Sequence, residues 1–171
     1  MVFVGIADGK APLGTWPDTK FTTVAETPVI KEKPFLYIDE NGEYFVFVPD
    51  LRIDSKGLSW TESYMGSGTS IPIDQFYIAH YDVDTADTIN NALESGKHLI
   101  LTPGIYNLDK PIQVNNENTV VLGLGLATLT AANGNACMKI ADVGGAMIAG
   151  VLFDAGEEKS EVLLEVGPEG S

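Results

Sequence analysis

An apolar-polar-apolar tripeptide recurs three times at constant spacing in the second half of the chain. The copies are Ile112-Gln113-Val114, Met138-Lys139-Ile140 and Leu164-Glu165-Val166, each 26 residues after the previous one. Such alternation is typical of a strand with one buried face. A fixed period of roughly 20 to 50 residues is the mark of a repeat architecture. The spacing therefore predicts strands stacked one above another, with the apolar positions inside and the polar ones in water.

A second strand-like pattern accompanies the first. Val121-Leu122-Gly123 and Met147-Ile148-Ala149 are also 26 residues apart, and Leu99-Ile100-Leu101 precedes the first of these by 22. Two strands per repeat, climbing roughly 4.8 Å per coil, predict an all-β fold, a parallel β-helix of about three coils. The alternative interpretation is an ordinary β-sandwich with three evenly spaced strands.

The 26-residue repeat is absent from residues 1–80. We therefore expect this part of the chain to form a separate, small β module. Two alternating runs, Lys33–Asp39 and Glu43–Val48, flank Glu40-Asn41-Gly42. An Asn-Gly pair between such runs is a strong hairpin signal. We therefore expect a hairpin near residues 34–48.

Residues 81–171 are predicted to form the second domain, which begins with a helix and continues into the first coils. The helix would start at Asp84 or Thr85 and end at Gly96. Its apolar face would consist of Ala86, Ile89 and Leu93. Because the first coil of a solenoid needs a cover over its apolar edge, we expect this helix to be a cap.

Charge excludes one class of partner. The chain has 24 acidic and 10 basic residues, for a net charge of -14, which would repel a nucleic-acid backbone. It has no run of 18 apolar residues, so no membrane partner is expected. The N-terminal residues do not resemble a signal peptide. Cys137 is the only cysteine, so no internal disulfide can form.

The series DTADTINNALESGKHLILTPGIYNLDKPIQVNNENTVVLGLGLATL resembles the opening of pectate-lyase-like right-handed parallel β-helix proteins. In those proteins a capping helix leads into a strand, a PPG-Y turn, a second strand, an asparagine-rich corner and a strand with GLG. The turn here is Thr102-Pro103-Gly104-Ile105-Tyr106. The resemblance implies a fold but no single chemistry, because this fold hosts lyases, hydrolases, tailspikes and epimerases.

More narrowly, TPVIKEKPFLYIDENGEYFVFVPD and VLFDAGEEKSEVLLEVGPEGS are similar to the N-terminal part of secreted bacterial proteins related to the family-55 exo-β-1,3-glucanases. This resemblance implies a secreted protein whose partner is a polysaccharide, a β-glucan. Those proteins are several times longer, and β-helix glycosidases generally carry their catalytic carboxylates on later coils. The chain is therefore expected to be inactive by itself. We expect the remainder of a β-helix, or self-association, to cover its open C-terminal edge.

Three carboxylates are candidates for catalysis. Glycoside hydrolysis needs two of them, about 5 to 9.5 Å apart. Asp142 and Asp154 each follow an inward strand, and Glu165 is expected to stack over Lys139. The alternative interpretation is that the two aspartates cap corners, and that Glu165 and Lys139 form a solvated ion pair.

A calcium site is conceivable at Asp82, Asp84 and Asp87, although the glycine turn and distal glutamate of an EF-hand loop are missing. Acids at a helix N-terminus also interact favourably with the helix dipole. No other cofactor is expected, and His80 and His98 are interpreted as structural or surface residues.

Trp16, Trp60 and Tyr64 lie in loops of the β module and are candidates for stacking on sugar rings, or else for filling a small core. Three functions stay open. The first is a β-glucan hydrolase, and the second is a non-catalytic carbohydrate-binding or assembly module. The third is a polysaccharide lyase, which the scarcity of Lys and Arg disfavours.

Overall fold

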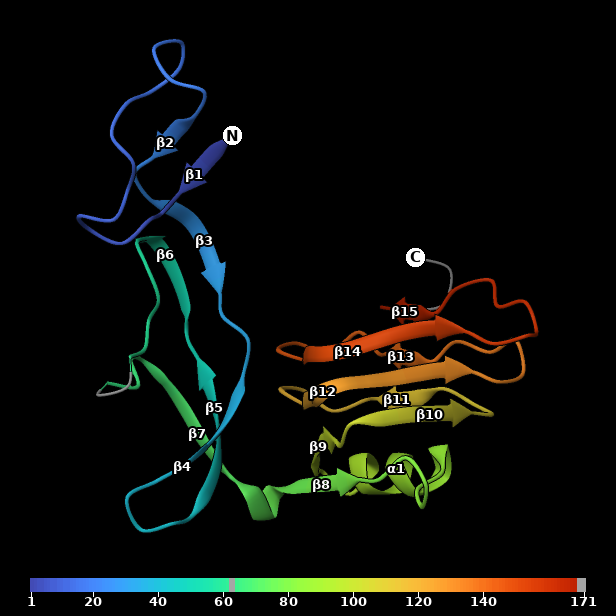
Figure 1. Ribbon diagram of the computed structural model, residues 1–171. Helices are drawn as coiled ribbons and strands as arrows, with labels where there is room; N and C mark the ends of the chain where they lie inside the picture. The colour runs from blue at the N-terminus through green and yellow to red at the C-terminus, as the bar shows by residue number, and fades with distance from the viewer. Residues whose placement is uncertain (62–63, 169–171) are drawn as a thin grey trace. The chain divides into compact units, whose positions relative to one another are not determined.

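The computed structural model describes residues 1–61 and 64–168. Two compact units divide the chain, Met1–Ile71 and Pro72–Ser171 (Figure 1). The sequence predicts this division at residue 80. It falls earlier because the strand Phe76–Ala79 pairs in parallel with His98–Leu101 and so belongs with the coils.

Among the residues that the structure describes, the first unit is built from short strands in three small sheets. A parallel pair joins β1 (Val2–Val4) to β2 (Thr22–Val24), and an antiparallel pair joins β3 (Thr27–Lys31) to β6 (Leu51–Ser55). The third sheet has the order β4-β5-β7 and comprises β4 (Phe35–Ile38), β5 (Tyr44–Pro49) and β7 (Gly68–Pro72).

Strands β4 and β5 form the hairpin predicted near residues 34–48. Ile38 pairs with Tyr44, and the connection is closed by Asp39, whose Oδ1 accepts hydrogen bonds from the backbone N–H groups of Asn41 and Glu43 at 2.9 and 2.8 Å. These bonds lower the pKa of Asp39, chiefly through the N–H of Glu43. The turn therefore depends on a charged side chain as well as on the Asn-Gly pair.

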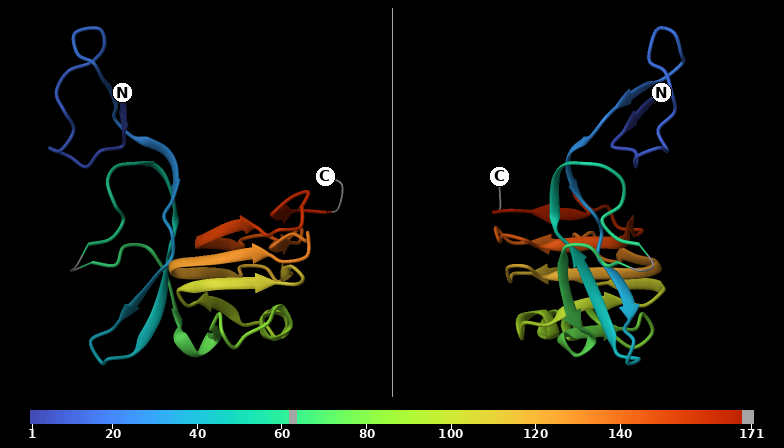
Figure 2. Two further views of the ribbon diagram at one scale, coloured as in Figure 1. Left: turned by 45° about the vertical axis from the view of Figure 1, so that its right-hand side comes forward. Right: turned by 90° about the vertical axis from the view of Figure 1, so that its left-hand side faces the viewer.

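The second unit is a parallel β-helix. A 3-10 turn (Ile73–Gln75), β8 (Phe76–Ala79) and helix α1 (Ala86–Glu94) precede the coils. One sheet contains β8, β9 (His98–Leu101), β10 (Gly104–Leu108), β12 (Val120–Ala131) and β14 (Met147–Ala155). The other contains β11 (Ile112–Val114), β13 (Met138–Ile140) and β15 (Leu164–Val166). Both views in Figure 2 show these strands stacked in levels.

The 26-residue register is confirmed in the sheet β11-β13-β15. Ile112 pairs with Met138, and Met138 with Leu164, all in parallel. Ile112 and Met138 are fully buried, whereas Leu164 is 39% exposed because no further strand covers it among the described residues. The interior column that the repeat predicted is therefore present.

The second pattern predicts two strand pairings, of which one is confirmed and the other is wrong by one residue. Val121 pairs with Leu99, as the spacing of 22 predicted. The expected pairing of Val121 with Met147 is wrong, because Met147 pairs with Val120. The cause is a corner of unequal length: residues 115–119 connect β11 to β12, whereas the longer segment 141–146 connects β13 to β14.

Residues 123–127, with the sequence GLGLA, form a corner inside the long strand β12. Its backbone is left-handed at Gly125 and Leu126, with φ of 50° and 62°, and Gly150 of β14 has a φ of 70°. A Cβ on Gly123 would lie 2.1 Å from the carbonyl oxygen of Gly150. The two coils therefore approach each other here more closely than side chains would allow.

Helix α1 caps the coils as predicted. Thr85 is its N-cap, and it exchanges hydrogen bonds with Thr88 in a capping box. Ala86, Ile89 and Leu93 are buried in the core. The helix thus takes the place that a preceding coil would occupy.

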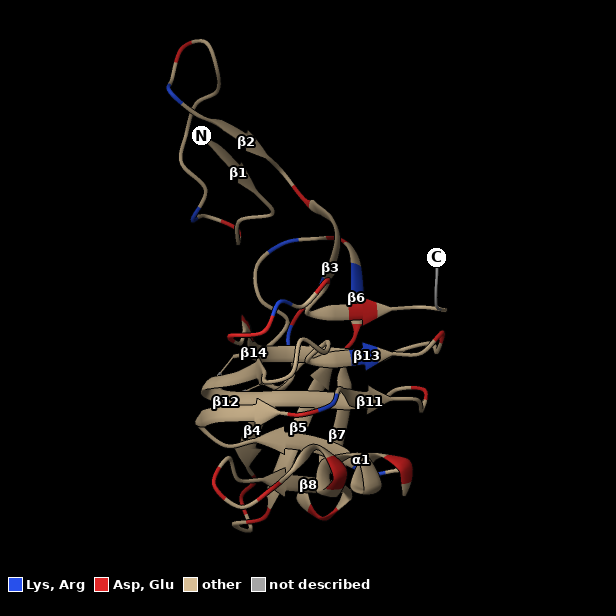
Figure 3. Cartoon of the chain, turned by 90° about the vertical axis from the view of Figure 1, so that its right-hand side faces the viewer, with Lys and Arg blue, Asp and Glu red and all other residues tan. Residues whose placement is uncertain are grey.

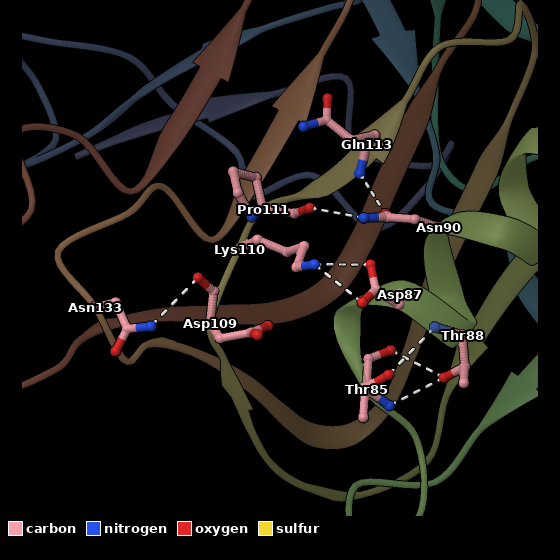
Figure 4. Close-up of polar contacts among 9 residues, drawn as sticks. All are labelled: Thr85, Asp87, Thr88, Asn90, Asp109, Lys110, Pro111, Gln113 and Asn133. Atoms are coloured by element: carbon pink, nitrogen blue, oxygen red, sulfur yellow. Dashed lines mark hydrogen bonds and ion pairs between the residues drawn. The ribbon is translucent and has the colours of Figure 1, made fainter.

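The polar face of α1 meets the edge of β11 (Figure 4). The side-chain amide of Asn90 donates to the carbonyl oxygen of Pro111 at 3.0 Å and accepts from the N–H of Gln113 at 2.8 Å. Lys110 binds both carboxylate oxygens of Asp87 at 2.9 Å. The backbone groups of Pro111 and Gln113 at this edge are therefore satisfied by the side chain of Asn90 in place of another strand.

The helices within residues 1–61 and 64–168 are all too short or too polar to traverse a lipid bilayer.

Candidate functional site

The outer face of the sheet β11-β13-β15 carries a polar column of three side chains. Gln113, Lys139 and Glu165 occupy equivalent positions on the three strands, one residue after the interior column of Ile112, Met138 and Leu164. Because successive strand residues point to opposite faces, these three side chains point outward. The column is a direct product of the repeat.

Lys139 and Glu165 form an ion pair within this column. The distance between Nζ and Oε2 is 2.8 Å, and the two side chains are 39% and 36% exposed. This is the solvated ion pair that the sequence predicts as the alternative to a catalytic role for Glu165. Exposed pairs of this kind contribute little to stability, typically about 1 kcal/mol or less.

A groove lies along one side of the column. Its volume is about 480 Å³, and it is lined by Pro111, Gln113, Gly134, Asn135, Ala136, Lys139, Glu161, Val162 and Glu165. A second hollow of about 210 Å³ lies on the other side and shares Gln113, Lys139 and Glu165 with it. The column therefore separates two hollows on one face of the β-helix.

The groove mixes hydrogen-bond donors and acceptors. Gln113 and Asn135 contribute amides, Lys139 an ammonium, and Glu161 and Glu165 carboxylates. Figure 3 shows that acidic residues are otherwise concentrated around α1 and in the turns that connect strands. The lining suits a ligand rich in hydroxyl groups, each of which donates and accepts.

The three carboxylate candidates do not gather at one place. Glu165 lies in the column, whereas Asp154 is exposed on β14, in the other sheet, and Asp142 is exposed after β13. The register pairs Asp154 with Thr130 of the coil below. A catalytic role for Asp142, Asp154 or Glu165 stays a prediction.

The aromatic candidates of the first unit have different environments. Trp16 is 70% exposed, and Tyr64 is exposed beside Thr61, with which it exchanges backbone hydrogen bonds. Trp60 is half-buried, and its ring packs on Phe35 with centroids 4.9 Å apart. Trp16 and Tyr64 are accessible for sugar stacking, while Trp60 also fills a small core. Substrate contact by all three stays a prediction.

The aspartates near the start of α1 are engaged by protein groups. Asp84 accepts from Tyr77, from the N–H of His80 at 2.8 Å and from Thr88 at 3.0 Å, and Asp87 binds Lys110. Burial alone would raise the pKa of Asp84, but these hydrogen bonds outweigh it and lower the pKa.

Asp82 lies exposed in the turn before α1. Among the residues that the structure describes, no three His, Cys, Asp or Glu side chains form a group suited to a metal ion. Calcium at Asp82, Asp84 and Asp87 stays a prediction.

Two titratable side chains, those of His98 and Cys137, pack in or beside the core of the β-helix. His98 packs on Phe76 with ring centroids 5.0 Å apart, and its Nδ1 accepts from the N–H of Val120 at 3.2 Å. Burial lowers the pKa of His98. Cys137 is fully buried, and its Sγ donates to the carbonyl oxygen of Leu129 at 3.2 Å. His98 has the structural role expected from the sequence, whereas the burial of Cys137 was not foreseen.

A stack of parallel coils closed by a helix, with a polar groove on its outer face, defines a pectate-lyase-like β-helix. The family model described as the LAM55 pectate lyase-like domain matches residues 76–171. The chain belongs to that family, and the resemblance seen in the sequence is confirmed.

Relatives extend the similarity to the whole chain. The chain is 46% identical over all 171 residues to an exo-β-1,3-glucanase of Streptomyces sp. (strain SirexAA-E / ActE), in its N-terminal region, and spans 27% of that protein's length. The solved structure of sacteLam55A from Streptomyces sp. SirexAA-E matches with a TM-score of 0.89 and 46% identity, covering 99% of this chain and 30% of that one. A variant of sacteLam55A in complex with glucose matches with a TM-score of 0.88 at the same identity and coverage.

Proposed function

We propose that this chain serves as the N-terminal part of a secreted exo-β-1,3-glucan hydrolase and that the catalytic carboxylates lie outside these 171 residues. The observation that carries the proposal is the alignment of all 171 residues of the chain with an exo-β-1,3-glucanase, at 46% sequence identity. The aligned region is 27% of that glucanase's length. The substrate of the longer protein would be a β-1,3-glucan. The chain would supply the capped start of the β-helix.

The positions of the carboxylates support the separation of this chain from the chemistry. A glycosidase needs one carboxyl group that its surroundings keep protonated, usually by burial. Asp142 and Asp154 are exposed, and Glu165 is paired with Lys139. None of the three has the apolar environment that a general acid requires.

Sugar release from laminarin tests the proposal. The 171-residue chain is expected to release no reducing sugar, whereas a longer protein that contains it is expected to release glucose. Glucose release by the short chain would contradict the inactivity, and Asp142→Asn, Asp154→Asn and Glu165→Gln variants would then locate the source. An inactive longer protein would contradict the assignment to glucan hydrolysis.

A second function, assembly, is favoured by the last strand. Val166 is 62% exposed, although Val114, two coils below it in the same column, is fully buried. A strand edge with exposed apolar side chains favours pairing with another chain or coil. Analytical ultracentrifugation of the 171-residue chain tests this: association that Val166→Lys abolishes supports it, and a monomer at high concentration contradicts it.

A further inference from the structure

We infer that the groove beside the column of Gln113, Lys139 and Glu165 is a non-catalytic binding site for a neutral glucan chain. The identity of the sugar rests on the proposed function, while the preference for a neutral ligand follows from the groove itself.

The size of the groove fits a sugar ligand. Its volume of about 480 Å³ falls within the range of roughly 300 to 1,000 Å³ that is usual for small-molecule sites. The smaller hollow, of about 210 Å³, lies across the column and shares its three side chains. Two adjacent hollows with a common polar wall provide room for consecutive units of an oligomer.

The charges of the lining select a neutral ligand. Among the described residues that line the groove, Lys139 is the one cation, against the two carboxylates of Glu161 and Glu165. The whole chain carries a net charge of -14. A uronate or a phosphate would therefore be repelled, whereas neutral hydroxyl groups would not.

The polar groups of the groove differ in what they offer a ligand. The amide of Asn135 already accepts from the N–H of Asn133 and donates to the carbonyl oxygen of Ala136, so the column is the main contact surface. The ion pair of Lys139 and Glu165 is more than a third exposed on each side, so little free energy is lost when the pair opens. Each partner can then bond a hydroxyl group, in a charge-assisted hydrogen bond. The carboxamide of Gln113 lies next to them in the column and adds one donor group and one acceptor.

The backbone beneath these side chains is fixed before a ligand arrives. The N–H of Gln113 is bound to Asn90 of α1, and the strands below Lys139 and Glu165 are held by the parallel ladder. Pre-organisation of this kind reduces the entropy cost of binding. The cap and the repeat thus jointly set the geometry of the groove.

The test is a titration of the isotope-labelled 171-residue chain, followed by amide NMR spectra. Laminaritetraose is expected to shift the signals of Gln113, Asn135, Lys139 and Glu165, and tetragalacturonate to shift none of them. Gln113→Ala and Lys139→Ala should each weaken binding about three- to tenfold, the effect of losing one or two hydrogen bonds. Asn107→Ala removes an exposed amide from β10, in the other sheet, and should leave binding unchanged.

The outcomes separate this inference from the proposed function. The inference would be overturned if neither laminaritetraose nor cellotetraose shifts the groove signals, if the shifts fall outside the groove, or if tetragalacturonate produces them equally. If the longer protein nevertheless hydrolyses laminarin, the proposed function stands. If cellotetraose shifts the groove signals and laminaritetraose does not, the groove is a site for a neutral glucan, and only its preference for the β-1,3 linkage is contradicted.

Discussion

Asn90 of helix α1 accepts a hydrogen bond from the backbone N–H of Gln113 at 2.8 Å, and its amide donates to Pro111, two residues earlier, at 3.0 Å. One side chain thereby satisfies a donor and an acceptor on the edge of the first strand of its sheet. In the interior of the sheet, the backbone of a neighbouring strand performs this role.

Replacement of Asn90 by Leu should therefore destabilise the second unit. The N–H of Gln113 and the carbonyl of Pro111 would lose their partners next to the core, at a cost of about 2 kcal/mol. Urea unfolding measures the change. Asn91→Leu alters the next, exposed residue of the same helix and should change stability by less than about 0.5 kcal/mol. Equal losses in both variants would rule out a specific role for Asn90.

Gly123→Ala should destabilise the β-helix by about 1 to 3 kcal/mol, the usual cost of overpacking. The new Cβ would lie 2.1 Å from the carbonyl oxygen of Gly150, which is backbone of the adjacent coil. Gly144→Ala is the matched control, because a Cβ there meets nothing within 4 Å. Thermal unfolding compares the two variants, and an unchanged midpoint for Gly123→Ala would show that the coils can separate freely.

His98 should make stability depend on pH. Burial lowers its pKa in the folded protein below the ordinary 6.5, so the unfolded chain binds the proton more readily. Stability is therefore retained above pH 6.5 and lost as the pH falls from 6.5 through the lower folded pKa. His98→Gln should weaken this dependence in urea unfolding at several pH values. Identical slopes in the two proteins would exclude His98 as the source.

Cys137 should be inert in the folded protein. Burial raises the pKa of its thiol, and the reactive thiolate is therefore suppressed. A thiol-specific reagent such as Ellman's reagent should react slowly with the native chain and at once in denaturant. Rapid stoichiometric labelling without denaturant would mean that the core opens readily around Met138.

The sequence predicted the interior of the β-helix well because columns of equivalent residues repeat at one spacing. Ile112, Met138 and Leu164 follow from that period alone. The helix cap was also predictable, from Thr85 and from the apolar face that ends at Leu93. In both cases the pattern and the physical requirement for burial coincide.

The corners were predicted less well, because their length can change without altering the strands. The pairing of Met147 with Val120 differs by one residue from the spacing that the tripeptides suggested. The bond between Asn90 and Gln113 was also missed, since a polar residue on a helix looks the same whether it meets water or a strand edge. A recurring separation of 23 residues between α1 and the segment around β11, as from Asp87 to Lys110 and from Asn90 to Gln113, was the available signal.

The groove could be predicted only in part. The outward column of Gln113, Lys139 and Glu165 follows from the repeat, and so does the pairing of Lys139 with Glu165. Asn135 and Glu161 come from connecting loops, whose path the period does not determine. The sequence therefore indicated one wall of the groove and left the opposite wall undefined.

The unequal corners have an evolutionary consequence. Val120 pairs with a residue 27 positions later, Ala127 with one 24 positions later, and Met138 with one 26 positions later. An extra residue in one bend is thus compensated by fewer residues in another bend of the same coil, so that the strands return to the same register. Natural variants should accordingly tolerate compensating insertions and deletions at the bends, whereas a single uncompensated indel inside a strand would put every subsequent rung out of phase.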